Sequence, residues 1–428
     1  MTHFAVVSPP FPSHVRALEA LACELIDRGH RVTWVAQADV QRLLRDSRIG
    51  FRPVGVVTHP PGSLDGVLGR AARPGGPLGL RRVIQDVSQA TAMLCRDGRE
   101  ALVALRVDAV IADQMEAAGG LLAEALGLPC ISVACALPVN RETRVPLPVM
   151  PFGYAEDDGA LKRNEGSTRV YDWLMTPHAR VIRGQAADWG LAPRSSLADC
   201  VSPLLQLSQT TAGFDFPREQ LPAGFHHVGP LRPPPSNEEP LGLPVAADRP
   251  FVFASLGTLQ GGRFKIFHRI ARACRALDIQ LLVAHCGGLD ERQVAALGCA
   301  GATWVTDFAP QRAAIARADV VVTHGGLNTV MDSLAAGKPM LLLPIAFDQP
   351  GVAARVVHVG AGLRRLPALA GTGSLRQALQ RLLADRAYAQ RAAVLGREVE
   401  AAGGVPLAAD LIEEALAQQP VAEEAELA

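Results

Sequence analysis

Lysine is nearly absent from this sequence, since only three of its 42 basic residues are lysines and the rest are arginines. Chemistry that depends on a lysine, such as a Schiff base or a Walker-type phosphate loop, therefore has almost no candidates, and no G-x-x-x-x-G-K-[ST] motif is present. The eight cysteines form no C-x-x-C pair and no zinc-like spacing. We expect reduced thiols in the core of a cytosolic protein, and we predict no metal site.

An excess of either charge is also missing, because 42 acidic residues balance the 42 basic ones. Without a positive field we expect no nucleic-acid partner. The first ten residues lack the basic start and long apolar stretch of a signal peptide. The longest uncharged apolar run, residues 125–139, is too short to span a bilayer and contains two prolines. These absences predict a cytoplasmic protein.

Both halves of the chain alternate between short apolar runs and helical apolar faces, which is the pattern of doubly wound α/β sheets. Residues 58–90 and 136–190 are less regular. In the first half the pattern predicts strands 4–7, 31–35, 109–112 and 131–134 with helices 15–25 and 117–126. In the second half it predicts strands 251–255, 280–284, 302–305, 320–323 and 340–343 with helices 267–276, 313–318 and 328–336.

Seven prolines between residues 229 and 250 separate the two halves. Such a density excludes a helix or a central strand, so we interpret residues 230–250 as a linker. The sequence therefore predicts two Rossmann-like domains facing across a cleft, residues 1–229 and residues 251–416. The acidic end of the chain, residues 417–428, lacks a large apolar face, and we expect it to be disordered.

The most informative segment is residues 320–329, where an apolar strand ends in two glycines, Gly325 and Gly326, before a helix. Glycines let an anion approach the backbone, and the helix start presents free N–H groups and the positive end of its dipole. His324, Asn328 and Thr329 add side-chain donors. Taken alone, the pattern fits a tight strand-to-helix turn equally well, but its surroundings favour a phosphate site.

Sugar-binding residues surround this turn in the predicted sheet. Asp332 lies one helical turn after Asn328, and its carboxylate would repel phosphate but accept hydrogen bonds from sugar hydroxyls. Ligands of open α/β sheets bind at the carboxyl ends of the strands. Three other strand ends add suitable groups. Asp348 and Gln349 form an acid–amide pair for sugar hydroxyls, and Phe308, followed by Gln311, offers an aromatic face for a base. Thr258 offers a hydroxyl for phosphate. The combination predicts a nucleotide-sugar site.

A candidate base lies in the first half. His14 follows the first predicted strand at the start of a helix, whose positive end disfavours imidazolium, so we expect a neutral ring that accepts a proton. Asp113 ends the strand 109–112, which places it on the same edge of a parallel sheet. A carboxylate on one ring nitrogen would fix the tautomer and stabilise the protonated ring. From position alone, a solvated residue at a helix start is the favoured interpretation of His14, and a strand cap is an equally good interpretation of Asp113.

The segment from Phe308 to Gln349 resembles the donor-binding signature of UDP-sugar glycosyltransferases of the GT-B fold, W-x-x-Q, H-x-G-x-N-[ST]-x-x-[ED] and [DE]-Q. Two departures are visible: Phe308 replaces the tryptophan, and the spacing from Gln311 to His324 is two residues shorter than in plant members. The resemblance implies that His324, Thr329 and Thr258 hold a diphosphate, that Asp332 holds the ribose, and that Asp348 and Gln349 hold the sugar. It also makes His14 the base and Asp113 its partner.

Five segments resemble bacterial carotenoid glucosyltransferases, namely residues 1–18, 113–119, 132–138, 254–261 and 347–355. This likeness covers nearly the whole chain and implies UDP-glucose as co-substrate and zeaxanthin as acceptor, glucosylated at each ring hydroxyl in turn. It implies an inverting reaction without metal or resident cofactor, in which residues 1–229 bind the acceptor and residues 251–416 bind the donor. Because a carotenoid resides in membrane, we also expect transient contact with a membrane surface at its inner face.

Three other functions share parts of these patterns. A glycosyltransferase of macrolides or other lipophilic natural products would have the same donor motifs. A UDP-sugar epimerase would use the same two-domain fold without an acceptor cleft. A non-catalytic nucleotide-sugar sensor would bind the donor and would tolerate the loss of His14.

Overall fold

The computed structural model describes residues 1–73, 75–233 and 239–419, and it confirms the predicted α/β class. The first of its two sheets has seven parallel strands in the order β3-β2-β1-β4-β5-β6-β7. The strand order reverses between β1 and β4, and such a switch point opens a crevice at the carboxyl ends of the two strands. The strands are β1 (His3–Val7), β2 (Arg31–Gln37), β3 (Gly50–Val54), β4 (Ala109–Asp113), β5 (Cys130–Ala134), β6 (Leu205–Ser208) and β7 (Phe225–His227).

Helices cover both faces of this sheet, which explains why β1, β4 and β5 are buried along their whole length. The 29-residue helix α3 begins inside residues 58–90, and α5 and α6 lie inside residues 136–190, the two segments without a regular pattern in the sequence. α5 buries only two of its residues, so it has no apolar stripe for a sequence pattern to reveal. The helices of this half are α1 (Pro12–Asp27), α2 (Ser63–Ala72), α3 (Pro77–Leu105), α4 (Ala117–Ala125), α5 (Asp158–Leu174) and α6 (Thr176–Asp188), with short turns η1 (Ala38–Leu43) and η2 (Leu197–Cys200).

The second sheet repeats the plan with six parallel strands in the order β10-β9-β8-β11-β12-β13. Its switch point lies between β8 and β11. The strands are β8 (Phe251–Ser255), β9 (Gln280–Ala284), β10 (Trp304–Thr306), β11 (Val320–Thr323), β12 (Met340–Leu342) and β13 (Gly362–Arg364). The helices are α7 (Gly257–Gln260), α8 (Phe264–Arg275), α9 (Glu291–Ala300), α10 (Gln311–Arg317), α11 (Leu327–Ala335), α12 (Gln349–His358), α13 (Thr372–Ala384), α14 (Ala387–Ala401) and α15 (Gly404–Ala417).

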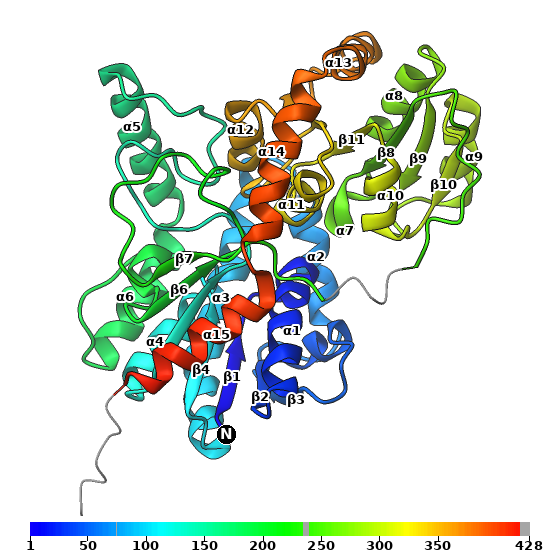
Figure 1. Ribbon diagram of the computed structural model, residues 1–428. Helices are drawn as coiled ribbons and strands as arrows, with labels where there is room; N and C mark the ends of the chain where they lie inside the picture. The colour runs from blue at the N-terminus through cyan, green and yellow to red at the C-terminus, as the bar shows by residue number, and fades with distance from the viewer. Residues whose placement is uncertain (74, 234–238, 420–428) are drawn as a thin grey trace, which may run out of the picture.

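The last helix returns to the first half of the chain. Figure 1 shows α15 in red beside α1 and the first sheet, and its apolar residues belong to the same core as β1 and α1. On the surface, Arg28 and His30 pair with Glu413 at 2.8 Å each. The sequence pattern placed α15 with the second domain, whereas it packs on the first. Of the tail expected to be disordered, residues 420–428 lie outside the described residues.

A buried ion pair joins the two halves. Arg355 of α12 is fully buried, and its Nε lies 2.6 Å from Oδ1 of Asp215, while Arg218 Nε lies 3.0 Å from Oδ2. The Arg355 guanidinium also lies 4.3 Å from the ring centre of Phe216. Burial raises the pKa of Asp215, but the two guanidinium groups outweigh it and lower that pKa to about 2. The pair therefore stays charged and fixes α12 against the first half.

Candidate active site

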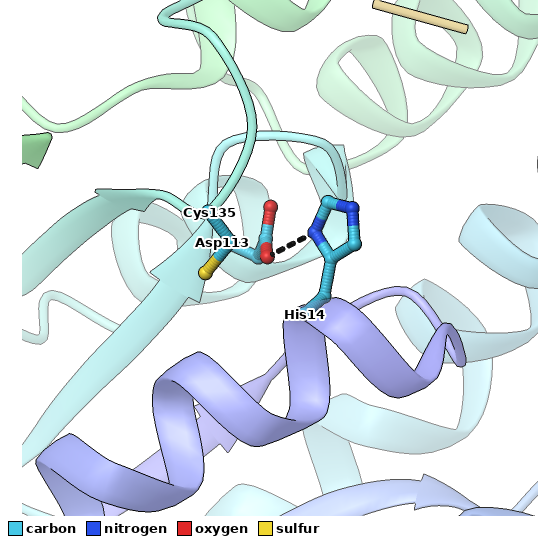
Figure 2. Close-up of side chains that lie close together, drawn as sticks. All are labelled: His14, Asp113 and Cys135. Atoms are coloured by element: carbon cyan, nitrogen blue, oxygen red, sulfur yellow. Dashed lines mark hydrogen bonds and ion pairs between the residues drawn. The ribbon is translucent and has the colours of Figure 1, made fainter. Parts of the chain in front are cut away.

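His14 and Asp113 meet at the switch point of the first sheet. β1 and β4 are parallel neighbours with Val7 opposite Ala112, so the residues that follow them lie at one edge. His14 Nδ1 lies 2.7 Å from Oδ2 of Asp113, and the carboxylate is fully buried. Figure 2 marks this interaction with a dashed line. Oδ1 of Asp113 accepts a hydrogen bond from the Met115 backbone at 2.9 Å. With Nδ1–H donated to the carboxylate, Nε2 of His14 is the atom that can accept a proton.

The pKa shift of His14 runs opposite to the one expected from its place at a helix start. Burial lowers the pKa of His14, but the hydrogen-bonded carboxylate of Asp113 and the charge of Asp348 raise it more, so the net shift is upward. Two carboxylates therefore set the direction of this shift. A base with a raised pKa accepts a proton more readily but is protonated at a higher pH.

Cys135, which follows β5, completes a cluster with this pair. His14, Asp113 and Cys135 each offer one ligand atom, and these atoms all lie within 4.8 Å of one another. Burial and the neighbouring Asp113 raise the pKa of the Cys135 thiol well above its usual value, so the thiol keeps its proton. A metal ion binds the thiolate, and it would also compete with a proton for the imidazole. The expectation that no metal is used stays a prediction.

His324 lies at the switch point of the second sheet, where β11 ends. Glycines make room for its ring: a Cβ atom added to Gly257 or to Gly326 would lie 2.7 Å from ring atom Cε1. Burial lowers the pKa of His324 to about 4, so the ring is neutral and has one N–H to donate. A neutral donor beside the start of α11 suits an anionic group such as a diphosphate.

The other residues of the predicted phosphate turn differ in what they contact. Gly325 does not line the cavity; a Cβ atom there would lie 3.2 Å from the backbone oxygen of Gln349, so its small size serves packing. Asn328 Nδ2 donates to the Ser13 carbonyl at 3.3 Å, which links the second half to the residue before His14. Thr329 and Thr258 line the cavity, and their contact with a diphosphate stays a prediction.

Asp332 lies beside this turn and is held by two side chains. Its Oδ2 accepts from Gln311 Nε2 at 2.7 Å, and its Oδ1 lies 3.2 Å from Nε of Arg232. Arg232 belongs to the segment interpreted as a linker and was not among the predicted site residues. Its charge within a Pro-rich segment was the one feature of the sequence that could have drawn attention to it. Phe308 is 70 % exposed, so its ring face is open to a base.

Asp348 and Gln349 begin α12 and face the first half. Asp348 Oδ2 accepts from the Leu137 backbone at 3.3 Å, and burial raises the pKa of this carboxyl. Gln349 Oε1 accepts from the backbones of Ile345 and Ala346 at 2.9 and 2.8 Å, which leaves its NH₂ group as the side chain's donor. This loop brings a carboxylate and an amide toward the cavity, as a sugar requires.

One cavity of about 3040 Å³ connects the two halves. It is lined by every predicted site residue except Asp113, which stands behind His14, and Gly325. Its first-half wall comes from α1, α3, α5, α6 and the loops after β1 and β5, and the part formed by α3, α5 and α6 includes the apolar residues Ile84, Val170 and Tyr171. None of that part was predicted from the sequence, because these residues carry no motif.

Two Rossmann-like halves that face each other across one cavity define a glycosyltransferase of the GT-B fold. Solved structures of this class match over nearly the whole chain. The glycosyltransferase of kitacinnamycin matches with a TM-score of 0.77 and 25% identity, covering 97% of this chain and 99% of its own. The calicheamicin glycosyltransferase CalG4 matches in fold with a TM-score of 0.74 and 23% identity, covering 98% of this chain and 100% of its own.

The chain belongs to the UDP-glycosyltransferase family. The family model described as UDP-glucoronosyl and UDP-glucosyl transferase matches residues 192–399. The chain is 49% identical to the zeaxanthin glucosyltransferase of Pantoea ananas, covering 98% of both chains. It is 47% identical to that of Pseudescherichia vulneris, covering 97% of this chain and 98% of the relative. No described helix is both long and apolar enough to cross a membrane.

Proposed function

We propose that the protein transfers glucose from UDP-glucose to the ring hydroxyls of zeaxanthin, first to one end and then to the other. The observation that supports this most is the single cavity in which His14 of one half and His324 of the other both lie. The two zeaxanthin glucosyltransferases that match along their full length support the choice of acceptor.

The proposed reaction is a single displacement. Nε2 of His14 removes the proton of the acceptor hydroxyl while its oxygen attacks the anomeric carbon, and Asp113 stabilises the protonated ring. The bond to the diphosphate breaks as the new bond forms, so an α-linked donor yields a β-glucoside. His324 and the backbone N–H groups at the start of α11 stabilise the charge that develops on the diphosphate. Asp348 and the NH₂ group of Gln349 orient the glucose.

The cavity suits a large apolar acceptor. Pockets that bind one small molecule usually measure about 300–1,000 Å³. The space here, about 3040 Å³, has room for a nucleotide sugar together with a long second substrate. The apolar lining from α3, α5 and α6 fits a carotenoid ring and part of its chain. A lipophilic natural product is the second candidate, because the two solved structures of this class carry the names of such products.

Mass spectrometry of the reaction products tests the proposal. Incubation with UDP-glucose and detergent-dispersed zeaxanthin is expected to give zeaxanthin monoglucoside followed by diglucoside, with one UDP released for each glucose transferred. The rate is expected to be unchanged by EDTA, since the proposed chemistry uses no metal. Glucosylation of a macrolide aglycone in preference to zeaxanthin would refute the acceptor, and release of UDP without any glucoside would refute the transfer.

We further propose that the protein is cytoplasmic and visits the inner face of the membrane to collect its acceptor. Exposed apolar residues support this: Val170, Trp173 and Leu174 on α5 are 56%, 74% and 36% exposed. Val170 and Leu174 also line the cavity, so this apolar surface adjoins the acceptor pocket. Tryptophan favours the boundary between lipid headgroups and acyl chains.

Co-sedimentation with vesicles of phosphatidylethanolamine and phosphatidylglycerol tests this surface. The native protein is expected to bind, and the double variant V170S/W173S to bind several-fold less, because it loses apolar area that enters the bilayer. The matched control is L369S, which removes a 79% exposed leucine from the second half and should leave binding unchanged. Equal binding by all three proteins would contradict the proposal.

A further inference from the structure

Arg232 is a charged residue of the linker that lies in the donor site. Its side chain lines the cavity and is 17 % exposed. Nε lies 3.2 Å from Oδ1 of Asp332, and Nη1 donates to Gln209 Oε1 at 3.2 Å and to the Leu231 carbonyl at 2.9 Å. These contacts aim the guanidinium at Asp332 and hold it there.

One nitrogen of this guanidinium has no partner within the part of the chain that the structure describes. Nη2 of Arg232 is buried and makes no hydrogen bond with any described residue. Buried polar groups without a partner are rare in proteins, because each costs free energy when it leaves water. An unpaired donor beside a ligand cavity is most simply explained by an acceptor atom that the ligand supplies.

The charges around Nη2 indicate which kind of atom that is. Arg232 and Asp332 neutralise each other, so the pair does not favour an anion as an unpaired arginine would. A hydroxyl fits, because it can donate to the Asp332 carboxylate and at the same time accept from Nη2. Gln311 holds the other oxygen of Asp332 at 2.7 Å, which keeps the carboxylate turned toward Oδ1 and Arg232.

The position of the pair indicates which hydroxyl is bound. Gln311, which contacts Asp332, follows Phe308 by three residues, and a base can stack on the exposed ring of Phe308. In the other direction along the chain, α11 carries Asp332 one turn after Asn328 and begins at the predicted phosphate turn that contains His324. Within a nucleoside diphosphate, the group between base and phosphate is the pentose.

We propose that Arg232 is a donor-binding residue that, together with Asp332, binds a ribose hydroxyl and so selects ribonucleotide over deoxyribonucleotide donors. This inference rests on the proposed use of UDP-glucose. A sugar that lacks the hydroxyl leaves both Nη2 and the carboxylate without a partner, and sites built for a hydroxyl discriminate strongly against its absence. The linker thereby takes part in donor selection.

Calorimetric titration with UDP, 2′-deoxy-UDP and 3′-deoxy-UDP tests the role of Arg232. The native protein is expected to bind at least one of the deoxy analogues about 10- to 100-fold more weakly than UDP. In R232M this ratio should fall several-fold, because UDP loses the hydrogen bond from Nη2 while the Asp332 carboxylate still accepts one from the hydroxyl. In the transfer assay, R232M should raise KM for UDP-glucose about tenfold or more while kcat changes little.

The control is R249M, which alters an exposed arginine at the end of the same linker. It should bind all three nucleotides as the native protein does. An unchanged ratio in R232M would overturn the inference even if overall affinity falls, since a merely structural arginine weakens all nucleotides alike. Equal binding of UDP and both analogues by the native protein would also overturn it. If the native protein binds none of them, the proposed donor itself is wrong.

Discussion

Replacing His14 by alanine is expected to lower kcat for glucose transfer by about 10²- to 10⁴-fold. The acceptor hydroxyl has a pKa far above 7, so the reaction needs a base as the oxygen attacks. Among the described residues, His14 combines a buried carboxylate partner with a place on the cavity wall. The measurement is the initial rate of UDP release in the presence of acceptor, for H14A and for the native protein.

UDP affinity separates loss of the base from loss of the fold. H14A should bind UDP as tightly as the native protein, because the phosphate turn belongs to the other half. The control H268A changes a histidine of α8 outside the large cavity and should keep full activity. A variant H14A that retains more than half of the native kcat would refute the role of His14.

The second large effect is expected from Asp113→Asn. The amide keeps the shape of the side chain but loses the charge that stabilises the protonated ring and the acceptor that selects the tautomer, so kcat should fall by about 10²-fold or more. The Asp113 charge also raises the pKa of His14 against the lowering effect of burial. The base must be neutral, so in the native protein kcat/KM should fall as the pH drops through a value above 6.5.

In D113N this acidic limb of the profile should move to lower pH. Burial lowers the pKa of His14, and without the Asp113 charge only Asp348 raises it. The profile is measured as kcat/KM between about pH 5 and pH 9 at saturating UDP-glucose, with the zeaxanthin concentration varied. An acidic limb at the same pH in both proteins would show that another group titrates there.

Much of the site could be predicted because it lies where parallel strands end. Short apolar runs identified β1, β4, β8 and β11, and residues that follow such strands must share one edge of their sheet. The side-chain partners were harder to predict. Asn328 was expected to face a phosphate, but its amide contacts the carbonyl of Ser13, and only the packing of the two halves creates that contact.

The acceptor wall and the last helix could not be predicted for a different reason. α5 has almost no buried face, so its helical period is hidden among exposed residues. α15 is amphipathic, but its local sequence does not indicate that it packs against α1, near the other end of the chain. Arg232 was hidden in the same way, because its partner Asp332 lies in another domain.

The central claim is that one imidazole of the first half faces a sugar whose leaving group is held by the second half. The most direct measurement is a crystal structure with zeaxanthin and an unreactive UDP-glucose analogue. We predict that the acceptor oxygen lies about 2.6–3.2 Å from His14 Nε2 and about 3–3.5 Å from the anomeric carbon. A complex in which the acceptor hydroxyl and the diphosphate occupy separate pockets, with His14 contacting neither, would contradict the account.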